Sequence, residues 1–115
     1  MTRPIRTRLH DIAAACDAIA RYVTRADVDE EIVFDAIRAR LIEIGEAVKD
    51  LDGKITAREP DIPWTDIARM RDLLAHRYFD TTHAIVDATA RHDVPLLSAA
   101  VNRLLNGTLA PDSDG

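Results

Sequence analysis

The chain has 115 residues, of which 47% are hydrophobic and 30% charged, and its net charge is −5. This length fits a single domain with its own core, and the composition excludes disordered and collagen-like chains. A negative net charge also argues against a protein that coats nucleic acid. The lone Cys16 cannot form an intramolecular disulfide, and no apolar run approaches the length of a membrane span. We therefore expect a cytoplasmic protein.

The N-terminal region has the pattern of an amphipathic helix. Apolar residues recur every three or four positions from Ile5 to Val23, which predicts a helix over about residues 4–24. Pro4 suits the first position of such a helix. Cys16 lies on the apolar stripe, so we expect it to be an inert part of the core.

A second helix is predicted over about residues 28–52. Asp27 followed by Glu30 resembles a helix start, and Gly53 is a natural stop after the last apolar position. Gly45 lies inside the apolar stripe, where glycine costs about 1 kcal/mol relative to alanine. We expect that another backbone approaches the helix closely at this glycine.

The C-terminal half continues the helical pattern. Residues 54–62 form a connector, Pro63 opens a third helix over about 63–77, and a fourth helical region covers about 82–106. Pro95 should kink or break that fourth helix, and Gly107 should end it. The prediction is an all-α domain over residues 1–107, an antiparallel bundle of four main helices, followed by a loose tail at 108–115.

One charged residue interrupts the third apolar stripe. At 100° per residue, Arg71 lies about 40° from Ile67, in the middle of the apolar face. A charge at such a position needs a partner or a polar cleft. The charged end of Arg71 could reach past the apolar face to solvent, it could meet an acid on another helix, such as Glu43 or Glu46, or it could bind an anion. The segment 69–77 is locally positive in an acidic chain, which favours a confined anion site.

His76 and Tyr78 follow Arg71 near the end of the third helix. In a regular helix the Cβ atoms of Arg71 and His76 lie about 10 Å apart, so the two groups converge if Arg71 extends, if the helix end unwinds, or if a second subunit brings its own pair close. Asp72 is four residues before His76 and could orient the imidazole and favour its protonated form. The alternatives are that His76 caps the helix and that Tyr78 belongs to the core. No histidine spacing typical of a metal site is present, so we expect no metal.

The segment from Arg71 to Tyr78 resembles the Arg-x4-His-x-Tyr motif of HepT-like proteins, which belong to the HEPN superfamily of small α-helical proteins. The similarity covers about residues 5–106. It includes Ile44-Gly45-Glu46-Ala47 in the second helix and Pro60-Asp61-Ile62-Pro63-Trp64 before the third.

The resemblance implies a HEPN-like homodimer in which the motifs face a shared cleft. It implies the toxin ribonuclease of a toxin–antitoxin pair, with RNA as substrate and no cofactor. On the matched positions, Arg71 and His76 become the catalytic pair. Tyr78 becomes the site to which an MNT-type nucleotidyltransferase antitoxin transfers AMP.

Two positions depart from the family pattern. Asp72 stands where the family often has Asn, and Asp87 stands where an aromatic residue often follows the Val. Asp72 could support His76 in catalysis, or it could neutralise Arg71 and weaken RNA binding. The alternatives to a ribonuclease are an inactive module that docks a nucleotidyltransferase or presents nucleotide to it, and a purely structural helical dimer.

Overall fold

A computed structural model describes the backbone of residues 4–76 and 81–108, and the side chains of residues 4–75 and 84–107. Every regular element in these ranges is helical, as the sequence predicts. The elements are α1 (Ile5–Tyr22), α2 (Glu30–Lys49), α3 (Gly53–Thr56), α4 (Trp64–His76), α5 (Thr81–Ala88) and α6 (Val94–Arg103), with π-helical segments at Thr89–Asp93 and Leu104–Thr108.

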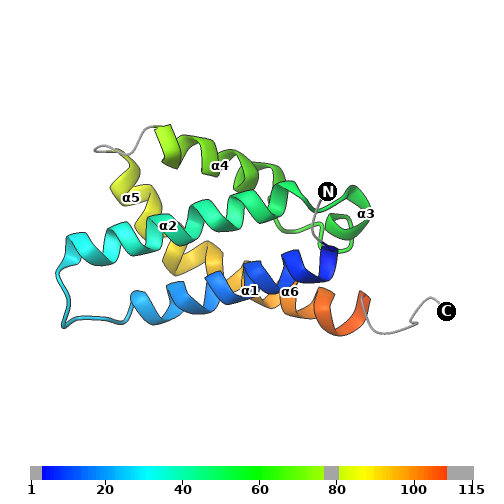
Figure 1. The fold of residues 1–115 in the computed structure, drawn as a ribbon, viewed down its shortest axis with the longest axis horizontal. Helices are drawn as coiled ribbons and strands as arrows, with labels where there is room; N and C mark the ends of the chain where they lie inside the picture. Colours follow the sequence, from blue (N-terminus) through cyan, green and yellow to red (C-terminus); the bar gives the residue numbers. More distant parts are fainter. Residues whose placement is uncertain (1–3, 77–80, 109–115) are drawn as a thin grey trace.

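The long helix α2 organises the bundle. It packs against α1 on one side and against α4 on the other, while α6 packs against α1 (Figure 1). The short α5 also contacts α2 and leads through the first π-helical segment into α6. In this arrangement, the third predicted helix with Arg71 rests on the second predicted helix with Gly45 and Glu46.

The core forms where the predicted apolar stripes meet. Within the described residues, the ten largest fully buried side chains come from six elements. They are Leu9, Ile12, Cys16 and Ile19 of α1, Leu41 and Ile44 of α2, Leu74 of α4, Val86 of α5, Val101 of α6, and Leu104 of the second π-helical segment. The prediction that Cys16 belongs to the core is confirmed, and burial raises the pKa of its thiol to about 12.

Two helix ends differ from the sequence prediction. Asp29, not Asp27, is the N-cap of α2, and its carboxylate accepts a hydrogen bond from the backbone N–H of Glu31. Asp27 is instead held by Arg25 through two hydrogen bonds of 2.7 and 2.9 Å, so its carboxylate is already engaged. At the other end, α2 stops at Lys49, and Gly53 begins α3.

The end of α2 does not need a glycine because the chain closes it with a tighter turn. The N–H groups of Asp50 and Leu51 donate to carbonyls only three residues back, those of Ala47 and Val48. Asp52 then caps α3 by accepting from the N–H of Ile55 at 3.0 Å. The predicted role of Gly53 as a helix stop is therefore wrong.

The irregularity predicted near Pro95 takes the form of a wider helical turn. The π-helical segment Thr89–Asp93 ends two residues before Pro95, and the chain stays helical on both sides. A regular α-helix would press the proline ring against the carbonyl of Arg91, and a π-helical turn relieves this clash. Gly107 lies within the second π-helical segment and does not end the helix. The predicted tail lies outside the described residues beyond Thr108.

Candidate active site

The site begins at the point where α4 crosses α2. A Cβ atom added to Gly45 would lie 2.5 Å from the Cβ of Arg71 and 3.2 Å from the carbonyl oxygen of Ile67. The first distance is shorter than real Cβ atoms show and the second is tight, so a side chain at position 45 would push α4 away from α2. The predicted close packing at Gly45 is confirmed, and it brings the backbone of Arg71 directly against α2.

Arg71 is held by two carboxylates. Its Nη2 lies 2.7 Å from Oε2 of Glu46 on α2, and its Nη1 donates to Oδ1 of Asp72 at 2.9 Å. Its Nε is buried and has no partner among the described residues. The prediction that Arg71 meets an acid on the second helix is right for Glu46, whereas Glu43 pairs with Arg40.

Lys49 completes a four-residue charged cluster, which consists of Glu46, Lys49, Arg71 and Asp72. Its Nζ lies 3.5 Å from Oδ1 of Asp72. The hydrogen bond from Arg71 and the nearby charge of Lys49 lower the pKa of the Asp72 carboxyl. The hydrogen bonds to Asp72 and Glu46 raise the pKa of Arg71. Because the cluster holds two cations and two anions, the positive charge of Arg71 is balanced in this structure.

The remaining residues of the predicted site are only partly placed. His76 is the last residue of α4, and its side chain lies outside the described residues, as does the whole of Tyr78. Their predicted convergence with Arg71, and the Asp72–His76 contact, therefore stay predictions. In this structure the carboxylate of Asp72 contacts Arg71 and Lys49.

Arg38 of α2 holds the last turn of α4, and no feature of the sequence singles this residue out. Its Nε and Nη2 both donate to the carbonyl oxygen of Leu74, at 3.1 and 2.7 Å. A helix end leaves its last carbonyls without helical partners, and a cation there is favourable. Arg38 thus anchors the turn that leads into His76.

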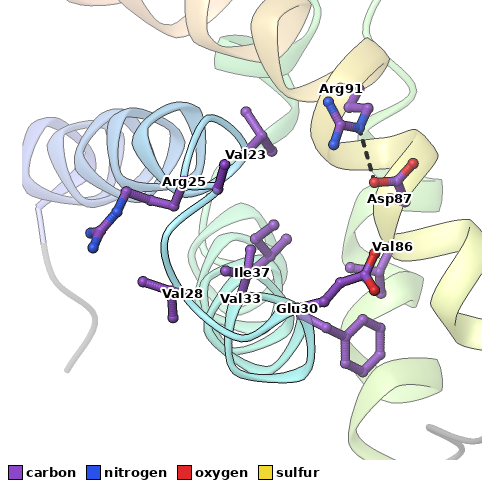
Figure 2. Close-up of a pocket in the computed structure, with 11 residues that line it drawn as sticks. Val23, Arg25, Val28, Glu30, Val33, Ile37, Val86, Asp87 and Arg91 are labelled. Atoms are coloured by element: carbon purple, nitrogen blue, oxygen red, sulfur yellow. Dashed lines mark hydrogen bonds and ion pairs between the residues drawn. The ribbon is translucent and has the colours of Figure 1, made fainter.

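The second departure from the family pattern, Asp87, lies away from this cluster. Figure 2 shows the lining of a pocket between the α1–α2 connection, α2 and α5, where valine and isoleucine side chains lie together with charged residues that include Asp87 and Arg91. The volume of this pocket is about 300 Å³. Asp87 accepts a hydrogen bond from Nε of Arg91 at 2.9 Å, one helical turn later. The acid at position 87 therefore forms an exposed ion pair beside a pocket of mixed polar and apolar lining, and none of the predicted site residues lines this pocket.

An apolar groove lies on another side of α4. It has a volume of about 410 Å³ and runs between α4 and the α5–α6 region. Three of the large apolar side chains exposed in the described part of the chain lie along it, namely Leu73 (40%), Ile85 (41%) and Leu96 (64%). Asp61, Asp66, Asp93 and Arg69 also line the groove.

Neither a metal centre nor a membrane anchor emerges from the described ranges. Within residues 4–76 and 81–108, no three His, Cys, Asp or Glu side chains are grouped as a metal ion would require. The described helices also include none with the length and apolarity needed to cross a bilayer. The charged cluster at the α2–α4 crossing is therefore the main concentration of polar chemistry near the predicted motif.

Comparison with known proteins assigns the chain to a family. Residues 11–104 match the model of a family described as "Ribonuclease HepT-like". The chain is 34% identical over 109 residues to "Probable ribonuclease HepT" of Thermococcus cleftensis, covering 90% of this chain and 98% of that protein. It is 33% identical over 107 residues to "Putative RNase MJ0125" of Methanocaldococcus jannaschii, covering 90% and 92%. No solved structure gives a significant match.

These matches confirm the resemblance to HepT-like proteins, and the matched residues 11–104 include the segment Arg71–Tyr78. The all-helical bundle agrees with the fold that the resemblance implies. The chain belongs to the HepT-like family of ribonucleases.

Proposed function

We propose that this chain is the toxin of a toxin–antitoxin pair and cleaves RNA without a metal ion, using Arg71 and His76. The observation that carries the proposal is the position of Arg71. The Gly45 crossing fixes its backbone, Glu46 orients its guanidinium, and the same helix ends at His76. A guanidinium held in this way suits the planar, bidentate recognition of a phosphate.

In the proposed reaction, the RNA 2′-hydroxyl oxygen attacks the neighbouring phosphorus and the bond to the 5′ oxygen breaks. His76 takes the proton from the 2′-hydroxyl or supplies one to the departing 5′ oxygen, work that suits an imidazole with a pKa near 6.5. Arg71 stabilises the charge that develops on the phosphate oxygens. DNA lacks the 2′-hydroxyl and should resist.

The direct test is cleavage of total cellular RNA in the presence of EDTA. Arg71→Ala and His76→Ala should each lower the rate about 10²- to 10⁴-fold, as expected for a positioned catalytic group. Arg58→Ala removes an equally positive but exposed residue outside the cluster and serves as the matched control. If the wild-type protein cleaves no RNA, the ribonuclease reaction fails, and the chain is the inactive module that docks a nucleotidyltransferase or presents nucleotide to it.

The proposed enzyme is a homodimer whose two motifs share one cleft. The apolar groove beside α4 supports this proposal, because a second copy could cover its exposed leucine and isoleucine side chains. The groove carries both acids and Arg69, so opposite charges can meet across a two-fold axis.

Sedimentation of a groove variant tests the dimer. Leu96→Asp should shift the protein towards monomer, whereas Ile32→Asp should not, since Ile32 is 60% exposed but lies outside the groove. A wild-type monomer at micromolar concentration would contradict the shared cleft.

Silencing of the toxin is the last part of the proposal. An MNT-type nucleotidyltransferase would transfer AMP from ATP to the hydroxyl of Tyr78 and release pyrophosphate. Because the toxin would act on RNA and the antitoxin would use ATP, we expect both proteins in the cytoplasm. The added phosphate and adenosine would occupy the space that RNA needs next to Arg71.

Intact mass after incubation with the cognate nucleotidyltransferase and ATP tests the modification. The mass should rise by one or more AMP units for the wild type and stay unchanged for Tyr78→Phe. Tyr22→Phe is the control, because the hydroxyl of Tyr22 is half-buried and accepts a hydrogen bond from Arg40 at 3.3 Å. Full labelling of Tyr78→Phe would remove Tyr78 from the mechanism.

A further inference from the structure

The guanidinium of Arg71 already contacts two carboxylates in this structure. Glu46 occupies Nη2, Asp72 occupies Nη1, and Nε is buried. A phosphate binds a guanidinium best through two N–H groups at once. A phosphate that binds through both Nη atoms would lie close to Glu46 and Asp72, and the repulsion between like charges favours the departure of one carboxylate.

The two carboxylates are not equally easy to displace. Glu46 comes from α2, and Arg71 is its only cationic partner within the described part of the chain. Asp72 has a second cation within reach, because Lys49 Nζ already lies 3.5 Å from the oxygen that contacts Arg71. Asp72 can leave Arg71 and keep a cation that it already contacts, whereas Glu46 has no second cation in contact within the described part of the chain.

The side chains around Asp72 are free enough to move. The Asp72 side chain is 56% exposed and that of Lys49 is 40% exposed, while that of Arg71 is 31% exposed. Pairs exposed to this extent contribute little to stability, so exchanging one for another costs little. Lys49 lies three residues after Glu46 on α2, so the side chain that contacts Arg71 and the side chain that contacts Asp72 project from the same side of that helix.

We propose that Asp72 occupies the phosphate position on Arg71 in the free protein, and that Lys49 receives the Asp72 carboxylate when a phosphate binds. Lys49 is then a positioning residue that acts through Asp72, and Glu46 keeps the guanidinium oriented during the exchange. This inference rests on the proposed function, in which Arg71 binds a phosphate of RNA. It also gives a role to Asp72, the position at which this chain departs from the family's usual Asn.

A different role for Lys49 predicts a different pattern of coupling. If Lys49 contacted the phosphate itself, its removal would weaken binding whether or not Asp72 is present. If Lys49 acts by receiving Asp72, its removal matters only while Asp72 carries a charge. A double-mutant cycle on positions 49 and 72 separates the two roles.

The experiment measures binding of inorganic phosphate at low ionic strength, where surface charges act most strongly. The reporter is the Nε–H signal of Arg71 in a proton–nitrogen NMR spectrum, assigned as the signal that Arg71→Lys removes. Asp72→Asn should tighten phosphate binding about two- to fivefold, and Lys49→Gln should weaken it by a similar factor. In the Asp72→Asn background, Lys49→Gln should change binding less than about twofold.

The matched control is Lys54→Gln, which removes the same charge from an exposed residue of α3. It should have the same small effect in both backgrounds. Equal weakening by Lys49→Gln with and without the Asp72 charge would overturn the exchange, as would an Asp72→Asn variant that binds phosphate no better than the wild type. Absence of phosphate binding at Arg71 in all variants would overturn it too.

Cleavage of RNA by the same variants keeps this inference separate from the proposed function. Under the exchange, Asp72→Asn lowers KM and Lys49→Gln raises it, with smaller effects on kcat. If the phosphate cycle shows the expected coupling but no variant cleaves RNA, the exchange stands and the ribonuclease reaction fails. If RNA is cleaved but the cycle shows no coupling, the ribonuclease reaction stands and the exchange fails.

Discussion

Two arginines join α2 to α4, and they are held in different ways. Arg38 donates two hydrogen bonds to the backbone carbonyl of Leu74, which cannot turn away unless α4 unwinds. Arg71 is bound by the carboxylates of Glu46 and Asp72, which are side chains about half exposed to solvent. Arg38 therefore links the two helices, whereas Arg71 has side-chain partners that a substrate can replace.

The largest expected difference between the two arginines is in catalysis. Arg71→Lys should lower RNA cleavage about 100-fold, because an ammonium group lacks the planar donors that stabilise charge on a phosphate. Arg38→Lys should leave the rate nearly unchanged, since Arg38 contacts a backbone carbonyl. Initial rates in EDTA check this, and an equal loss in both variants would place Arg38 in the catalytic site as well.

The next effect concerns the crossing that places Arg71. Gly45→Ala should lower the free energy of unfolding by about 1–3 kcal/mol, because the new Cβ meets the Cβ of Arg71 and the backbone of Ile67. Gly53→Ala is the matched control, as nothing lies within 4 Å of a Cβ at Gly53. Urea unfolding measures both variants, and equal stability would show that α4 can shift away from α2 without cost.

A smaller difference is expected when each arginine is removed and only stability is measured. Arg38→Ala should cost about 1–2 kcal/mol, because the carbonyl of Leu74 loses two charged donors at a helix end. Arg71→Ala should cost less than about 1 kcal/mol, as expected for ion pairs near the surface. A larger loss for Arg71→Ala would reverse the comparison and make Arg71 the structural link.

The smallest effect is a pH dependence of the free energy of unfolding, which we expect from the Arg71–Asp72 ion pair and not from the hydrogen bonds of Arg38. The folded pKa of Asp72 is lowered by Arg71 and Lys49, so its stabilising contribution is complete above the unfolded value of about 3.9 and is lost as pH falls through the folded value. Asp72→Asn should therefore be less stable than the wild type near neutral pH, and the two should converge in acid. Urea unfolding of both proteins from neutral pH to acid measures this difference in stability. A difference that does not change with pH would exclude the Asp72 ion pair as its cause.

The sequence predicted those parts of the site that depend on side-chain type and helical spacing. The apolar face around Arg71 indicated a partner on the second helix, and Glu46 is that partner. The glycine inside an apolar stripe indicated the close crossing at Gly45. Both inferences hold because a charge on an apolar helix face and a missing side chain each demand a specific surrounding.

Other parts could not be read from the sequence, for physical reasons. Every residue has a backbone carbonyl, so nothing marked Leu74 as the acceptor for Arg38. The N-cap of α2 was misplaced because Arg25 engages Asp27, and competition between two neighbouring acids depends on loop geometry. The turn that closes α2 at Asp50 likewise depends on backbone angles that no residue type there specifies.

The π-helical segment before Pro95 also constrains how the chain length can change. A π-helical turn holds one residue more than an α-helical turn. The segment Thr89–Asp93 is therefore equivalent to an α-helix into which one residue has been inserted. Deleting one residue within Thr89–Asp93 would restore a regular helix and return the carbonyl of the preceding turn to the proline ring. Such a deletion would therefore require replacement of Pro95 at the same time, which couples a change in length to a change in residue type.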